Sequence, residues 1–114
     1  MEDRRKVPRY HAEISAVLSQ PGSESVTAVM VDVLSVQGCC VRGTGLPEAG
    51  RKCWLTLQWQ GEEIRTEAQV AWKTIQGLAG LKFLSMDQAS SETLRELCAT
   101  LQLQPMPPPR LEDD

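Results

Sequence analysis

The sequence predicts an all-β fold, a small antiparallel barrel or sandwich of about six strands, followed by one C-terminal α-helix. Two observations lead to this fold class. Short segments of alternating apolar and polar residues recur up to position 84, with turn residues such as glycine and proline between them. After position 87 the apolar residues instead recur at helical spacing. A chain of 114 residues has room for one domain with a single core.

The strand segments differ in the burial that their patterns predict. The first alternates in polarity, which is typical of a half-buried strand, whereas the second is long, apolar and β-branched and predicts deeper burial. Gly61 marks a hairpin turn before the fifth segment, in which Trp72 is expected to share the inward face with Val70. The six segments are residues 12–18, 26–34, 39–42, 53–60, 64–73 and 78–84.

The helix is predicted from one apolar stripe, which must dock against the open end or a face of the β-structure. Asp87, Ser90 or Ser91 could cap its first turn. Residues 104–114 are rich in proline and end in acidic residues, which predicts a disordered tail. The tail contains a P-x-x-P pattern like that of polyproline ligands, although a frayed terminus is the favoured interpretation. The stripe consists of Leu94, Leu97, Cys98 and Leu101.

Composition excludes several function classes. The formal net charge of −3 argues against a general nucleic-acid binder, so neither DNA nor RNA is expected as a partner. No apolar run approaches the roughly 20 residues of a membrane span, and the N-terminus lacks a secretory signal. We therefore expect a cytoplasmic protein without membrane insertion.

Catalytic and metal-binding chemistry is not indicated either. The four cysteines lack C-x-x-C spacing, and His11 is the only histidine, so we expect reduced and mostly buried thiols and no metal site. No pair of carboxylates suits acid–base work, and nothing orients a nucleophile. The sequence thus predicts that the protein is not an enzyme and has no cofactor.

The one dense cluster of charge lies at the N-terminus, where residues 4–9 hold four cations. This segment has no apolar periodicity, and Pro8 disfavours helix at Val7, so residues 1–10 are expected to form a flexible cationic arm. Residues 11–103 would then hold the barrel and the helix. Guanidinium groups suit phosphates and the O6/N7 edge of guanine because their donors form a planar fork that is always charged.

The arm is matched by motifs further along the chain. Arg5-x-x-x-Arg9 is followed by Ser35-x-x-Gly38, with an acid just upstream of the serine. Residues 70–72 read Val-Ala-Trp, and residues 80–83 read Gly-Leu-Lys-Phe. Together these features, over roughly residues 3–101, resemble the PilZ family of bacterial receptors for cyclic di-GMP, with its R-x-x-x-R, [D/N]-x-S-x-x-G, V-x-W and G-x-x-F patterns.

The resemblance implies a PilZ-like β-barrel and a role for each matching residue. Arg5 and Arg9 would clamp cyclic di-GMP by guanine-edge, phosphate and stacking contacts, and Arg4 could add a further contact. Ser35 would donate or accept a hydrogen bond to the ligand, and Gly38 would allow close approach of ligand and backbone. The protein would be a stand-alone effector, monomeric or weakly dimeric, in which the ligand orders the arm and changes the surface offered to an unidentified partner protein.

One position departs from the family pattern. The family places its acid or amide two residues before the serine, where this chain has Val33, whereas Asp32 stands three residues before Ser35. A β-bulge at Val33–Leu34 would bring Asp32 back to the ligand side as a further binding residue. In a regular strand Asp32 would point away instead, and the chain would be a PilZ-like protein-interaction module that has lost cyclic di-GMP binding.

Overall fold

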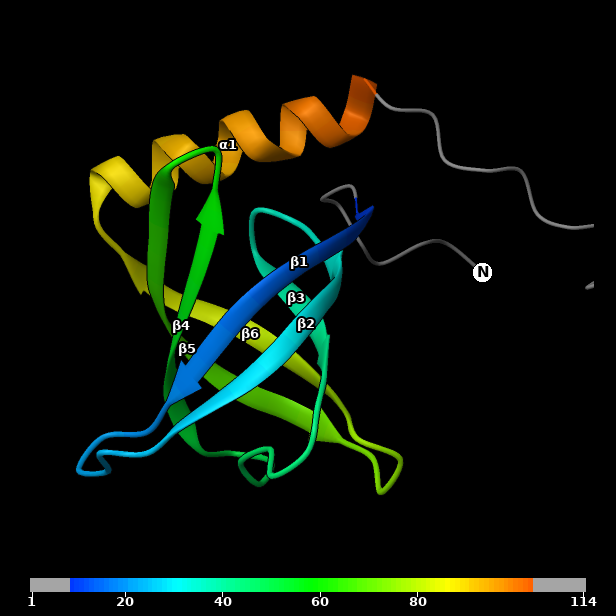
Figure 1. The fold of residues 1–114 in the computed structure, drawn as a ribbon, viewed down its shortest axis with the longest axis vertical. Helices are drawn as coiled ribbons and strands as arrows, with labels where there is room; N and C mark the ends of the chain where they lie inside the picture. The colour runs from blue at the N-terminus through cyan, green and yellow to red at the C-terminus, as the bar shows by residue number, and fades with distance from the viewer. Residues whose placement is uncertain (1–8, 104–114) are drawn as a thin grey trace, which may run out of the picture.

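In the computed structural model, which describes residues 9–103, six antiparallel strands close into a barrel and one helix lies across an end of it (Figure 1). The strands follow one another around the barrel in the order β1-β2-β3-β6-β5-β4. This closure confirms the predicted fold class and decides between barrel and sandwich. The elements are β1 (Tyr10–Ser19), β2 (Val26–Leu34), β3 (Gly38–Arg42), β4 (Lys52–Trp59), β5 (Glu62–Lys73), β6 (Leu78–Met86) and α1 (Gln88–Leu103).

Two pairings between strands distant in sequence close the barrel. β3 pairs with β6 along its whole length, from Gly38 opposite Lys82 to Arg42 opposite Leu78. β1 pairs with β4 only over residues 16–19, so the N-terminal half of β1 is not paired with β4. The remaining neighbours are joined by hairpins, which is why the connections are short.

The core is built from the inward side chains of all six strands. Along β4 the buried residues Cys53, Leu55 and Leu57 alternate with more exposed ones, as the sequence predicts. Along β1, Ala12, Ala16 and Leu18 are buried and Ile14 is half-buried. The fully buried side chains are mainly aliphatic, and each such burial contributes roughly 1.5–3 kcal/mol. They include Leu18, Val31, Leu34, Val41, Leu55, Leu57, Ile64 and Val70.

The deep burial predicted for β2 is wrong. Val26 is 64% exposed, and buried residues such as Val29 and Val31 alternate with partly exposed ones. The reason is architectural: a small barrel has only one buried face, so β-branched residues on the other face reach solvent. The high β-propensity of residues 26–34 therefore did not predict how deeply they are buried.

The inward orientation expected for Trp72 is also wrong. The register between β5 and β6 shifts between Val70 and Trp72, and Trp72 is 46% exposed. Its indole lies over Gly80 of β6, where a Cβ atom would overlap the ring nitrogen of Trp72. The bulge therefore turns the indole outward, and Gly80 makes room for it.

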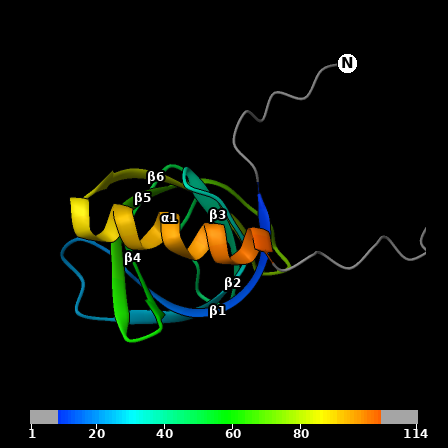
Figure 2. The same ribbon diagram turned by 90° about the horizontal axis from the view of Figure 1, so that it is seen from above.

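The helix covers one end of the barrel, and Figure 2 shows it from above. The Asp87 carboxylate accepts a hydrogen bond of 2.7 Å from the Ser90 amide and so caps the first turn. The Ser90 hydroxyl instead accepts a bond of 3.1 Å from the Arg65 amide, which ties α1 to β5. The predicted stripe faces the barrel, with Leu94 and Leu97 buried.

Residues 1–8 of the cationic arm, which was predicted over residues 1–10, and the whole proline-rich tail at residues 104–114 lie outside the described residues. Within residues 9–103, no helix is both long and apolar enough to span a membrane. The four cysteines all lie in this range and are free thiols, three of them buried, which confirms the expectation of reduced and mostly buried thiols.

Candidate functional site

Two irregularities in the barrel meet at Asp32. Between β2 and β3, Val31 is opposite Val41 and Val33 is opposite Cys40, so Asp32 has no partner of its own on β3. Between β1 and β2 the register also shifts, and two residues of β1 stand opposite Asp32. β2 thus carries the extra residue where it pairs with β3, and β1 carries the extra residue where it pairs with β2. Bulges of this kind can re-aim a side chain.

The bulge changes the alternation of faces that follows Asp32. Val31 and Leu34 are both fully buried although they are three residues apart, which a regular strand could not achieve. Asp32 and Val33, between them, are partly exposed. The sequence analysis left two alternatives open, a bulge at Val33–Leu34 and a regular strand. The register shift shows a bulge, which lies at Asp32, between Val31 and Val33.

The Asp32 carboxylate has a partner on the neighbouring strand. Its Oδ2 accepts a hydrogen bond of 2.8 Å from Nε of Arg42, and the two side chains are 25% and 55% exposed. This bond and the charge of Asp32 raise the pKa of Arg42, and the charge of Glu13 on β1 adds to the effect. Arg42 thus stands between two acids on the outer face of the barrel.

Arg9 and Cys40 complete the surroundings of Asp32. Burial raises the pKa of the Cys40 thiol, the charge of Asp32 raises it further, and the charge of Arg9 lowers it. Cys40 thus lies within the electrostatic reach of both Asp32 and Arg9, the residue before β1. Arg4 and Arg5 lie outside the described residues, so of the predicted clamp only Arg9 can be placed.

Ser35 organises the tight turn between β2 and β3. Its hydroxyl oxygen accepts hydrogen bonds from the amides of Gln37 at 3.1 Å and Gly38 at 3.2 Å. The Ser35 amide donates to the Gly38 carbonyl at 2.9 Å, and the residue is only 8% exposed. In this structure the Ser35 side chain is therefore used to hold the turn, and its predicted bond to a ligand stays a prediction.

Gly38 is required by the barrel itself. A Cβ atom at this position would overlap the carbonyl oxygen of Leu81 on β6. The adjacent Gln37 carbonyl accepts a hydrogen bond of 2.9 Å from the Phe83 amide, which fastens the turn to β6. The absence of a side chain at Gly38 thus has a structural cause, and the close approach of a ligand there stays a prediction.

Comparison with known proteins identifies the family. A sequence model described as the PilZ domain matches residues 3–100 of the chain. The chain belongs to the PilZ domain family. No curated protein sequence matches it.

Solved structures support the same fold for this PilZ domain. The inhibitor of motility MotI/DgrA from Bacillus subtilis superposes with a TM-score of 0.76 at 21% identity, over 93% of this chain and 55% of that one. The PilZ domain of YcgR from Escherichia coli, solved with c-di-GMP, gives a TM-score of 0.71 at 15% identity, over 90% and 94%. MrkH from K. pneumonia, in complex with c-di-GMP, gives a TM-score of 0.71 at 13% identity, over 91% of this chain and 55% of that one. The chain spans about half the length of MotI and MrkH.

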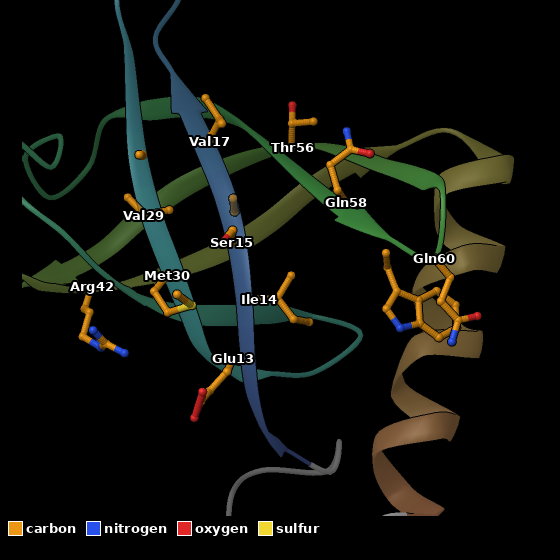
Figure 3. Close-up of a pocket in the computed structure, with 13 residues that line it drawn as sticks. Glu13, Ile14, Ser15, Val17, Val29, Met30, Arg42, Thr56, Gln58 and Gln60 are labelled. Carbon is orange, nitrogen blue, oxygen red and sulfur yellow. The ribbon is translucent and has the colours of Figure 1, made fainter.

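The sequence analysis of this PilZ domain missed a groove on the outer face of β1. It encloses about 800 Å³ and lies beside the N-terminal half of β1, which does not pair with β4. Figure 3 shows Glu13 and Arg42 towards one end of it and Gln58 and Gln60 towards the other. Its apolar lining includes Ile14, Val17, Met30 and Trp59.

Arg42 was missed as well. Nothing in the local sequence marks it, because its proximity to Asp32 depends on the register of β2 against β3 and on the bulge. Within residues 9–103, no group of three or more histidine, cysteine, aspartate or glutamate side chains could hold a metal ion.

Proposed function

We propose that this PilZ domain is a cytoplasmic effector that binds cyclic di-GMP on the outer face of the barrel, between the N-terminal arm and the β2–β3 turn. The observation that carries the proposal is the Asp32 carboxylate, which lies at the bulge and is outward and partly exposed. Asp32 then takes the role that the family assigns to an acid or amide one position later. The c-di-GMP complexes of YcgR and MrkH support the ligand class.

The chemistry of the proposed contacts is complementary to the ligand. A carboxylate accepts from the N1–H and N2–H₂ donors of guanine, and a charge-assisted pair of this kind is strong and directional. Arg9, with Arg4 and Arg5 from the arm, supplies the cations for the two phosphates and the guanine O6/N7 edge. The charges of Arg9 and Asp32 both act on the Cys40 thiol, which supports a shared site.

Ser35 and Gly38 act in this proposal through the turn that they build. The turn sets where β2 ends and therefore how the bulged segment presents Asp32. The Ser35 hydroxyl could exchange a turn bond for a ligand bond at modest cost, because one oxygen carries two acceptor lone pairs and a donor.

The ligand would act by ordering the arm against the barrel, which changes the surface offered to a partner protein. The domain performs no catalysis in this proposal. The fold shared with MotI and MrkH, whose chains are about twice as long, supports a role as a binding module.

A second candidate rests on the same strand. Val33 occupies the family's acid position, and the Asp32 carboxylate is already bonded to Arg42. Both facts favour a PilZ module that recognises a protein and has lost the ligand. This candidate predicts no nucleotide binding, so one titration separates the two.

The decisive experiment is a calorimetric titration of cyclic di-GMP into the full chain at low salt. We expect saturable binding in the wild type and about a ten- to hundredfold loss in Arg9→Ala, since a charge-assisted contact is removed. Arg51→Ala removes an exposed cation from the loop before β4 and should bind like the wild type. An absence of binding in the wild type, or equal losses in Arg9→Ala and Arg51→Ala, would refute the proposed site.

A further inference from the structure

The Asp32–Arg42 pair is a feature of this chain that the proposed function does not use. Nε of Arg42 donates to Oδ2 of Asp32 at 2.8 Å. Arg42 is opposite Met30 in the β2–β3 register, so Asp32, two residues further along β2, is its diagonal neighbour. Both side chains lie on the outer face and are partly exposed, which leaves the pair open to exchange with a ligand.

The two partners of Asp32 would compete for the same atoms. The Nε–H of arginine and the N1–H of guanine are donors of the same kind, and recognition of the guanine edge through N1–H and N2–H₂ uses both carboxylate oxygens. Oδ2 has two lone pairs, but two donors at one oxygen weaken each other's bond, so Arg42 and the guanine edge compete for it. Ligand binding is therefore favoured when the pair breaks.

We propose that Arg42 is an intramolecular competitor of the ligand, which occupies Asp32 in the free protein and is displaced by the guanine edge of cyclic di-GMP. This inference rests on the proposed function, because it requires Asp32 to be a ligand contact. It makes an unusual prediction: removal of a cation close to the site strengthens the binding of a doubly anionic ligand.

The test is a set of calorimetric titrations with cyclic di-GMP. Partly exposed ion pairs have small free energies, so we expect Arg42→Gln to bind about two- to fivefold more tightly than the wild type. Arg65→Gln is the matched control, since it removes the same charge from a side chain that lies 4.7 Å over the Trp54 ring, away from Asp32. It should not strengthen binding. In an Asp32→Asn background, Arg42→Gln should no longer strengthen it either.

Two outcomes would overturn the competition. One is that Arg42→Gln weakens binding or leaves it unchanged while Asp32→Asn weakens it, which would make Arg42 a ligand contact or a bystander. The other is that Arg42→Gln strengthens binding equally with Asp32 and with Asn at position 32. If neither the wild type nor Arg42→Gln binds, the proposed function fails, and the inference fails with it.

The pair can also be tested without ligand. In the wild type, the Arg42 Nε–H should give a nuclear magnetic resonance signal that exchanges slowly with water, and Asp32→Asn should abolish the slow exchange. Saturation with cyclic di-GMP should have the same effect as Asp32→Asn. A slowly exchanging signal that persists in the saturated protein would contradict displacement.

Discussion

The Ser35 hydroxyl oxygen lies 3.2 Å from the amide nitrogen of Gly38 and accepts a hydrogen bond from it. The two residues of the S-x-x-G motif therefore interact directly and hold the β2–β3 turn together. A change at either position alters the barrel as well as any ligand site. Their effects on binding can be interpreted only beside a measurement of stability.

Ser35→Ala should lower the free energy of unfolding by about 1–2 kcal/mol, because two amides in a partly buried turn lose their acceptor. Urea denaturation followed by tryptophan fluorescence measures this difference. The control is Ser23→Ala, which removes an acceptor from one exposed amide, that of Ser25, and should cost less than about 0.5 kcal/mol. Equal costs would mean that the Ser35 bonds do not hold the turn.

Gly38→Ala should be more destabilising, by about 3 kcal/mol or more, because the new methyl group meets a backbone carbonyl that cannot move aside. Gly22→Ala is the comparison: Gly22 has a φ of 79° and open space around it, so only backbone strain of about 1 kcal/mol is expected. A loss of stability at Gly38 no larger than at Gly22 would contradict the close approach of β3 and β6.

Gly80→Ala should be destabilising only while Trp72 is present, since the Cβ atom would overlap the indole. We expect a cost of about 1–2 kcal/mol in the wild type. In a Trp72→Ala background the same change should be neutral or stabilising, because alanine loses less backbone entropy than glycine in a strand. A double-mutant cycle, with each free energy of unfolding measured by chemical denaturation, gives the coupling free energy between positions 72 and 80. An equal cost in both backgrounds would show that the indole does not lie over Gly80.

Cys40 should be the one thiol that reacts with a disulfide reagent in the native protein, since the other three cysteines are buried. Burial and Asp32 raise its pKa, so little thiolate is present at pH 8 and the labelling rate should climb as the pH rises towards that pKa. Burial alone raises the pKa of Cys98 to about 11, so that thiol should react only after unfolding.

The charge of Asp32 gives this labelling a sharper test. Asp32→Asn removes a negative charge that disfavours the thiolate, so the pKa of Cys40 should fall and labelling at pH 8 should become faster. Glu13→Gln removes an equal charge from β1 and should have less effect. Faster labelling in Glu13→Gln than in Asp32→Asn would be inconsistent with Asp32 lying beside Cys40.

Most of the fold could be predicted from the sequence because each strand has one buried and one exposed face. That arrangement gives the residues a period of two, and β4 lies within one residue of the positions that the pattern indicates. Closure could not be predicted in this way. It depends on the pairing of β1 with β4 and of β3 with β6, and no local pattern reports which distant strands meet.

The error at Trp72 and the open alternatives at Asp32 share one cause. A bulge adds a single residue to one strand, which reverses the predicted face of every residue beyond it while leaving the composition unchanged. Asp32 could be marked as a candidate from the family pattern, whereas its partner Arg42 is defined only by the register of two strands. Local residue types thus indicated the candidate site, and strand pairing determined its geometry.

The central claim is that the outward Asp32 carboxylate recognises the guanine of cyclic di-GMP. It is tested most directly by titrating this ligand into the wild type, Asp32→Ala and Glu13→Ala. The account predicts saturable wild-type binding, a loss of about ten- to a hundredfold in Asp32→Ala, and little change in Glu13→Ala. Cyclic di-AMP, which carries the same phosphates without the guanine donors, should bind much more weakly to the wild type. Undiminished binding of cyclic di-GMP by Asp32→Ala would contradict the account.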